Sequence, residues 1–163
     1  RAGFLSRDFA KRWEPPMPKV LAAVDGTEQG SCVADYIINT ARDSVAMQVV
    51  VLNAQPKPQL WQTRGVAKEA IHDRLHELGQ KAVALITERL EHAQIATKQR
   101  LELGDPADTI VRCAKEEGCD LIVISAKRLG PVHSALVRST GVTFGSVAAQ
   151  VVKLADIPVV VVK

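Results

Sequence analysis

At 163 residues, the chain is long enough to form a single domain with one sizeable hydrophobic core. Aromatic residues make up only 4% of it, which argues against the base-stacking surfaces of many single-strand nucleic-acid binders, and the net charge of +3 comes from nearly balanced acids and bases. We therefore expect no nucleic-acid partner. Because no apolar run approaches the roughly 20 residues that span a bilayer, we expect no membrane partner either.

Residues 1–18 differ in character from the rest of the chain. Apolar residues at roughly helical spacing are followed by Pro15, Pro16 and Pro18, so we expect an N-terminal arm or linker here and one domain over residues 19–163.

The cysteines are odd in number and lack the spacing of a zinc site, and we interpret them as reduced structural thiols of a cytoplasmic protein: Cys32, Cys113 and Cys119.

Short apolar segments alternate with amphipathic ones from Lys19 onward. The strands are predicted at 19–25, 47–54, 95–103, 120–125 and 157–163, and the helices at 27–45, 64–92, 104–119 and 145–156. Thr27 and Asp105 are the expected N-caps, and the polar alternation of residues 95–103 is typical of an edge strand. In the long second helix we expect one apolar stripe, formed by Val66, Ala70, Leu75, Leu78, Ala82, Leu85, Ile86 and Leu90.

The alternation of strands and helices predicts a three-layer, doubly wound α/β sheet of five parallel strands, a Rossmann-like fold. Ligands of such sheets bind beyond the carboxyl ends of the strands. That rule points to Asp25-Gly26-Thr27, Asn53-Ala54, Gly104-Asp105 and Ser125, which begins a long polar connection. The glycine motifs of ordinary dinucleotide and Walker-type phosphate sites are missing from the sequence.

Few residues point to catalysis or to a metal ion. His72 and His76 are four residues apart on the long helix, but their charged surroundings and the lack of a predicted third ligand favour a solvated helix face. His133 has no partner that the sequence can assign as a nucleophile. Gly145 and Ser146 open the last helix, where they could bind phosphate, while Ser146 could equally cap the helix. We therefore predict no catalytic and no metal-binding residues.

The order of these features resembles the universal stress protein family over residues 19–163. The resemblance rests on "VLAAVDGTEQG", on "GDPADTIVRCAKEEGCDLIVIS" and on "GSVAAQVVKLADIPVVVV". It implies an adenine nucleotide alpha hydrolase-like sheet with the strand order 3-2-1-4-5, a homodimer formed through the last strand, and, in the members that bind nucleotide, ATP or AMP, with Mg²⁺ accompanying ATP. It implies at most slow ATP hydrolysis or autophosphorylation.

Carried over by position, the resemblance places adenosine at Asp25, Ala54 and Ile124 and the phosphates at Gly145, Ser146 and Val147. The full candidate site adds the neighbouring turn and loop residues Gly26, Thr27, Ser125, Lys127, Arg128 and Gly130.

The glycine loop of nucleotide-binding members is altered in this chain. Ser125 and Arg128 replace the two leading glycines, and about sixteen residues, not nine, separate Arg128 from Gly145. The basic residues of the loop could replace the lost backbone contacts with direct charge. Alternatively, the chain is a dimeric interaction module of the same fold that binds no nucleotide.

Overall fold

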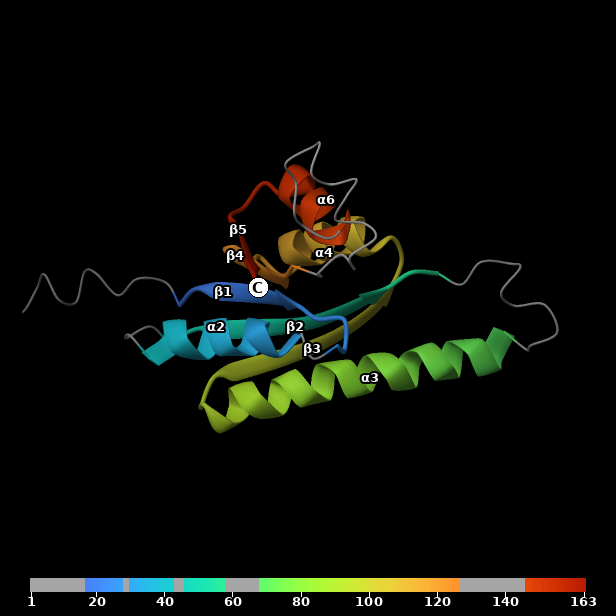
Figure 1. The fold of residues 1–163 in the computed structure, drawn as a ribbon, viewed down its shortest axis with the longest axis horizontal. Helices are drawn as coiled ribbons and strands as arrows, with labels where there is room; N and C mark the ends of the chain where they lie inside the picture. The colour runs from blue at the N-terminus through green and yellow to red at the C-terminus, as the bar shows by residue number, and fades with distance from the viewer. Residues whose placement is uncertain (1–16, 28–29, 43–45, 58–67, 127–145) are drawn as a thin grey trace, which may run out of the picture.

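The computed structural model describes residues 17–27, 30–42, 46–57, 68–126 and 146–163 (Figure 1). Strands and helices alternate along this part of the chain, and most of the predicted arm lies outside the described residues. The elements are β1 (Lys19–Ala23), α2 (Gly30–Arg42), β2 (Gln48–Gln55), α3 (Lys68–His92), β3 (Ala96–Leu103), α4 (Pro106–Glu116), β4 (Leu121–Ser125), α6 (Ser146–Leu154) and β5 (Val159–Val162).

The five strands form one parallel sheet in the order β3-β2-β1-β4-β5, which confirms the predicted fold and strand order. Helices α2 and α3 cover one face and α4 and α6 cover the other (Figure 1). The inner strands are buried on both faces, so their residues divide between two cores: Val20 and Ala22 pack toward α2 and α3, whereas Leu21 and Ala23 pack toward α4 and α6. This double burial explains why these strands read as continuous apolar runs.

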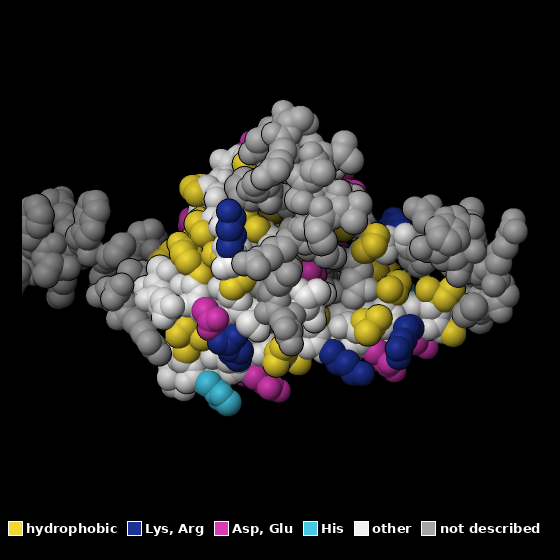
Figure 2. Space-filling view, in the orientation of Figure 1, with side chains coloured by type: hydrophobic (Ala, Val, Ile, Leu, Met, Phe, Trp, Pro, Cys, Tyr) yellow, Lys and Arg dark blue, Asp and Glu magenta, His cyan; other side chains and the backbone are white. Residues whose placement is uncertain are grey.

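The apolar stripe predicted for α3 is confirmed at Ala82, Ile86 and Leu90 and wrong at Ala70, Leu78 and Leu85, while Val66 lies outside the described residues. Leu78 and Leu85 are 47% and 51% exposed, and the buried positions are Gly79, Ala82, Val83, Ile86, Thr87 and Leu90. The rotation of the helix is explained by Gly79, where an added Cβ would lie only 2.9 Å from Nε2 of Gln55 and 3.1 Å from Oδ1 of Asn53. The helix therefore approaches β2 closely at a residue without a side chain. Apolar and charged side chains mix along its outer surface (Figure 2).

The N-cap prediction is confirmed for α4, and for α2 it stays a prediction because residues 28 and 29 lie outside the described part of the chain. The Asp105 carboxylate accepts hydrogen bonds from the backbone N–H groups of Ala107 and Asp108, at 3.0 and 3.2 Å. The described residues of α2 begin at Gly30, and the Thr27 hydroxyl donates to Oδ1 of Asp25. Thr27 thus belongs to the turn after β1, because the short carboxylate of Asp25 competes for local donors.

The side of β3 that faces α4 carries charged residues, and an ion-pair network joins them to that helix. Nζ of Lys98 lies 2.8 Å from Oε1 of Glu117, and the Arg100 guanidinium lies 3.0 Å from Glu116 and 2.5 Å from Glu102. Hydrogen bonds from Arg100, Arg112 and Lys98, respectively, are the main causes that lower the pKa of Glu102, Glu116 and Glu117. The network thus holds α4 against the charged face of the edge strand β3.

A buried amide pair ties α3 to the two inner strands. Nδ2 of Asn53 donates to the backbone oxygen of Val24 at 2.7 Å, and its Oδ1 accepts from Nε2 of Gln55, also at 2.7 Å. The same Gln55 nitrogen lies 3.1 Å from the backbone oxygen of Leu75 on α3. Asn53 is 3% exposed, so these bonds replace water that the core excludes.

Replacing Asn53 by Leu should lower the free energy of unfolding by about 1 to 3 kcal/mol, because the Val24 carbonyl and the Gln55 amide lose their buried partner.

The substitution Thr87→Val should have the opposite effect. It should raise the free energy of unfolding by about 1 kcal/mol, because the Thr87 hydroxyl is buried without a hydrogen-bond partner. Urea denaturation at neutral pH measures both. Equal destabilisation by the two variants would contradict the assigned role of Asn53.

The ion-pair network should make stability depend on pH in the acid range. Each carboxyl has a lower pKa in the folded chain, so its contribution is present above the unfolded value of about 4.3 and is lost as pH falls through the folded value. Glu117→Gln should therefore narrow the difference in unfolding free energy between pH 7 and pH 3.5. The control is Glu88→Gln, on the exposed surface of α3, which should leave that difference unchanged.

Candidate ligand site at the carboxyl ends of the strands

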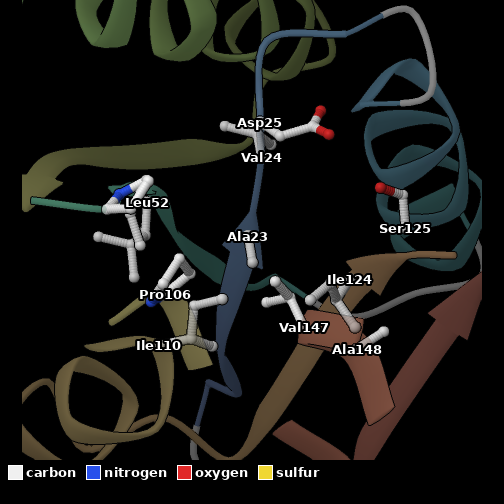
Figure 3. A pocket seen from close by; sticks show the side chains of 12 residues that line it. Ala23, Val24, Asp25, Leu52, Pro106, Ile110, Ile124, Ser125, Val147 and Ala148 are labelled. Carbon is white, nitrogen blue, oxygen red and sulfur yellow. The ribbon is translucent and has the colours of Figure 1, made fainter. Parts of the chain in front are cut away.

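A cavity of about 320 Å³ opens at the carboxyl ends of β1, β2 and β4, beside the first turns of α4 and α6 (Figure 3). This volume is at the lower end of the range for small-molecule sites. The lining residues are Ala23, Val24, Asp25, Leu52, Ala54, Pro56, Pro106, Ile110, Ile124, Ser125, Val147 and Ala148.

The cavity is mostly apolar and has polar groups on one side. Figure 3 shows the Asp25 carboxylate and the Ser125 hydroxyl on the same side, with Leu52 and Pro106 opposite them. Ile110 contributes to the wall from α4, and Val147 from α6. Such a surface suits a flat, largely apolar group that carries hydroxyl or amino donors at one edge.

The turn after β1 holds the Asp25 carboxylate at the rim of the cavity. Its Oδ1 accepts a hydrogen bond from the backbone N–H of Thr27 at 3.0 Å and from the Thr27 hydroxyl at 2.7 Å. Gly26 has a φ of +78°, and a Cβ there would lie 2.9 Å from Cβ of Ala82 on α3. The turn therefore requires glycine both for its backbone conformation and for its close approach to the helix.

The amide pair of the core also supports this turn. The backbone oxygen of Val24 immediately precedes Asp25, and it accepts the hydrogen bond from Asn53. The backbone N–H of Val24 is bonded to the oxygen of Leu52, at 2.9 Å. Both polar backbone groups of Val24 are thus tied to β2, which fixes the direction in which the chain leaves the sheet.

The start of α4 forms a second rigid part of the wall. Pro106 occupies the first helical turn, where its missing N–H costs no hydrogen bond, and Asp105 caps the helix. A Cβ at Gly104 would lie 2.6 Å from Oγ1 of Thr109, so any larger residue at this position would displace the Thr109 side chain.

The structure brings five of the predicted site residues together around the cavity: Asp25, Ala54, Ile124, Ser125 and Val147. Gly26 and Thr27 form the adjoining turn, and Ser146 is the first residue of α6. Outside the described residues lie Lys127, Arg128, Gly130 and Gly145, together with His133.

Sequence reasoning missed most of the apolar wall. Pro56, Pro106, Ile110 and Ala148 line the cavity, yet in the sequence they are indistinguishable from loop, cap and core residues. The one usable signal was the position of Pro106 directly after the third strand, at the ligand end of the sheet. The others are recognised only when strands and helices distant in sequence are brought together.

The thiols of Cys113 and Cys119, which could carry other chemistry, do not line the cavity. Burial raises the pKa of the Cys113 thiol, and it raises that of Cys119 to about 11, which accords with unreactive structural thiols. Within the described ranges, no group of three or more His, Cys, Asp or Glu residues could hold a metal ion. The described helices include none with both the length and the apolar character needed to cross a membrane.

Comparison with known proteins identifies relatives of the whole domain. The model of the universal stress protein family matches residues 17–163. Universal stress protein MJ0531 of Methanocaldococcus jannaschii is 28% identical over 160 residues, which cover 98% of this chain and 90% of the relative.

Solved structures share the fold at lower identity. Hypothetical protein MJ0577 superposes with a TM-score of 0.72 at 22% identity, covering 90% of this chain and 96% of that one. A universal stress protein from Archaeoglobus fulgidus, solved in complex with dAMP, gives 0.60 at 22% identity over 90% and 98% of the two chains. A universal stress protein family protein from Arabidopsis thaliana, solved with AMP bound, gives 0.62 at 18% identity over 90% and 91%. Because the family model extends from the residues before β1 to the end of β5, the chain belongs to the universal stress protein family.

Proposed function

We propose that this chain binds an adenine nucleotide, ATP or AMP, in the cavity at the carboxyl ends of β1, β2 and β4, and acts as a regulatory protein of the stress response. The observation that carries the proposal is the cavity itself, which brings Asp25, Ala54, Ile124, Ser125 and Val147 together. Neighbours of the same fold were solved with AMP and dAMP, which supports this ligand class. None of the described cysteines is paired in a disulfide, which accords with a reducing compartment, and we propose the cytoplasm.

In this proposal the adenine ring lies against the apolar wall of Leu52, Pro106 and Ile110, and the Asp25 carboxylate accepts hydrogen bonds from donors of the adenosine. The phosphates lie toward the first turn of α6, where Ser146 and Val147 begin the helix and its unpaired backbone N–H groups favour an anion. Gly145, Lys127, Arg128 and Gly130 belong to the connection that precedes α6 in sequence, and we assign them to the same phosphate region. With ATP, Mg²⁺ would be held mainly through the phosphates.

The nucleotide proposal is tested on protein purified without added ligand. Mass spectrometry of the released small molecules should find AMP or ATP, and calorimetry on nucleotide-free protein should show binding. Asp25→Ala should weaken it about 10-fold or more, because a hydrogen bond to a charged group contributes roughly 1.5 to 3 kcal/mol. Gly145→Val should also weaken binding, because it adds a branched side chain in the phosphate region.

The matched control is Asp73→Ala, an exposed carboxylate on α3 that does not line the cavity. It should leave the affinity unchanged. Protein that releases no nucleotide and gives no binding heat with either AMP or ATP would refute the proposal.

An open, apolar edge of the sheet supports a second property, homodimer formation through β5. The backbone oxygen of Pro158 accepts a hydrogen bond from Ile122 of β4 at 3.0 Å, and that of Val162 accepts one from Ala126, directly after β4, at 2.7 Å. Because alternate residues of a parallel strand bond to opposite sides, Val159 and Val161 direct their backbone N–H and C=O groups away from β4. An apolar edge strand of this kind is a template for pairing with another chain, and we propose a second copy of this one.

Val161→Pro should convert the dimer to a monomer, because it removes an outward N–H group without breaking the bonds between β4 and β5. Val161→Ala removes side-chain volume but keeps the N–H, and it should stay dimeric. Light scattering coupled to size-exclusion chromatography measures the mass of each species. A monomeric wild-type chain, or a dimer that Val161→Pro leaves intact, would refute the β5 interface.

A further inference from the structure

His72 and His76 form a pair of exposed side chains in the N-terminal part of α3. Their spacing of four residues places them one helical turn apart, and the structure stacks the two imidazole rings, with centroids 6.5 Å apart and planes inclined by 15°. Both side chains are exposed, as expected from the charged sequence around them. The structure adds that the two rings lie on the same side of the helix and close together.

The pair borders a second cavity, of about 80 Å³, between α3 and the carboxyl ends of β2 and β3. This cavity shares no lining residue with the larger one, and it lies on the other face of the sheet: Leu52 and Ala54 line the larger cavity, whereas Asn53 and Gln55 line the smaller. The lining residues are Asn53, Gln55, His72, Leu75, His76, Gly79, Leu101, Glu102 and Leu103.

Three of the charged groups near the pair, Arg74, Glu77 and Glu102, are engaged in ion pairs, while Asp73 lies next to His72 in sequence. Arg74 lies between the two histidines in sequence, and its guanidinium pairs with Glu77 at 3.8 Å. The Glu102 carboxylate pairs with Arg100 and Arg112, at 2.5 and 3.3 Å. The imidazoles are therefore the lining groups best suited to bind a soft or borderline cation, since a neutral imidazole offers a nitrogen lone pair at the mouth of the cavity.

We propose that His72 and His76 chelate one divalent late first-row transition ion, such as Zn²⁺, with water in the remaining coordination positions. Two histidines at this spacing on one helix face are the ligands that helical zinc motifs use, and imidazole suits Zn²⁺, Cu²⁺ and Ni²⁺ better than Mg²⁺ or Ca²⁺. With two protein ligands, the ion exchanges readily, unlike the ion of a closed four-ligand site. Binding links two successive turns of α3 and stiffens the part of the helix next to the small cavity.

The test uses the full chain without a histidine tag, after treatment with a chelator. Calorimetry with Zn²⁺ should show a site with a stoichiometry of one that Mg²⁺ does not occupy. His72→Ala and His76→Ala should each weaken Zn²⁺ binding at least about 10-fold, since loss of even an indirect partner of a metal ligand costs 10- to 100-fold. His92→Ala is the matched control, because His92 is exposed on the last turn of the same helix and does not line the cavity.

Hydrogen exchange provides a second readout. Zn²⁺ should slow amide exchange around residues 72–76 in the wild-type chain and in His92→Ala, and should not do so in the other two variants. Circular dichroism checks that each variant keeps its helix content. The proposal is overturned if Zn²⁺ does not bind, if binding survives in the double variant of His72 and His76, or if His92→Ala weakens it equally.

Discussion

The burial of β2, β1 and β4 on both faces is the constraint on which the rest of this structure depends. Strands buried in this way must pair every backbone group in the sheet, and parallel neighbours can be joined only by crossovers that carry helices to one face or the other. The two cores follow from this arrangement, since alternate residues of each inner strand pack in opposite directions. The carboxyl ends of the same strands then meet at one edge, where the larger cavity opens.

Within this apolar sheet, Asn53 is the polar group that connects the core to the candidate site. Its amide holds the residue before Asp25, and through Gln55 it is joined to the backbone of α3. The helix can come this close because Gly79 and Gly26 leave room for their neighbours. The position of the Asp25 carboxylate is thus set by the packing of rigid elements on three sides.

The alternating direction of successive side chains along β2 separates two sites at the end of that strand. Leu52, Ala54 and Pro56 line the larger cavity, for which we propose a nucleotide, and Asn53 and Gln55 line the smaller one beside the histidine pair. The larger cavity is apolar with a carboxylate at its rim, and the smaller is bordered by imidazoles. Because successive side chains of a strand point to opposite faces, adjacent residues serve chemically different surfaces.

Local patterns in the sequence were sufficient to predict the strands, the parallel sheet, the Asp105 cap and the end of the sheet at which the larger cavity opens. These features depend on periodicity and on short-range chemistry, as in the continuous apolar runs of the inner strands. Only the tertiary structure decided that Leu78 and Leu85 face solvent and that Pro56, Pro106 and Ile110 share a cavity. The rotation of a helix and the lining of a cavity are set by contacts between residues distant in sequence, such as Gly79 against Asn53 and Gln55, and no local pattern records them.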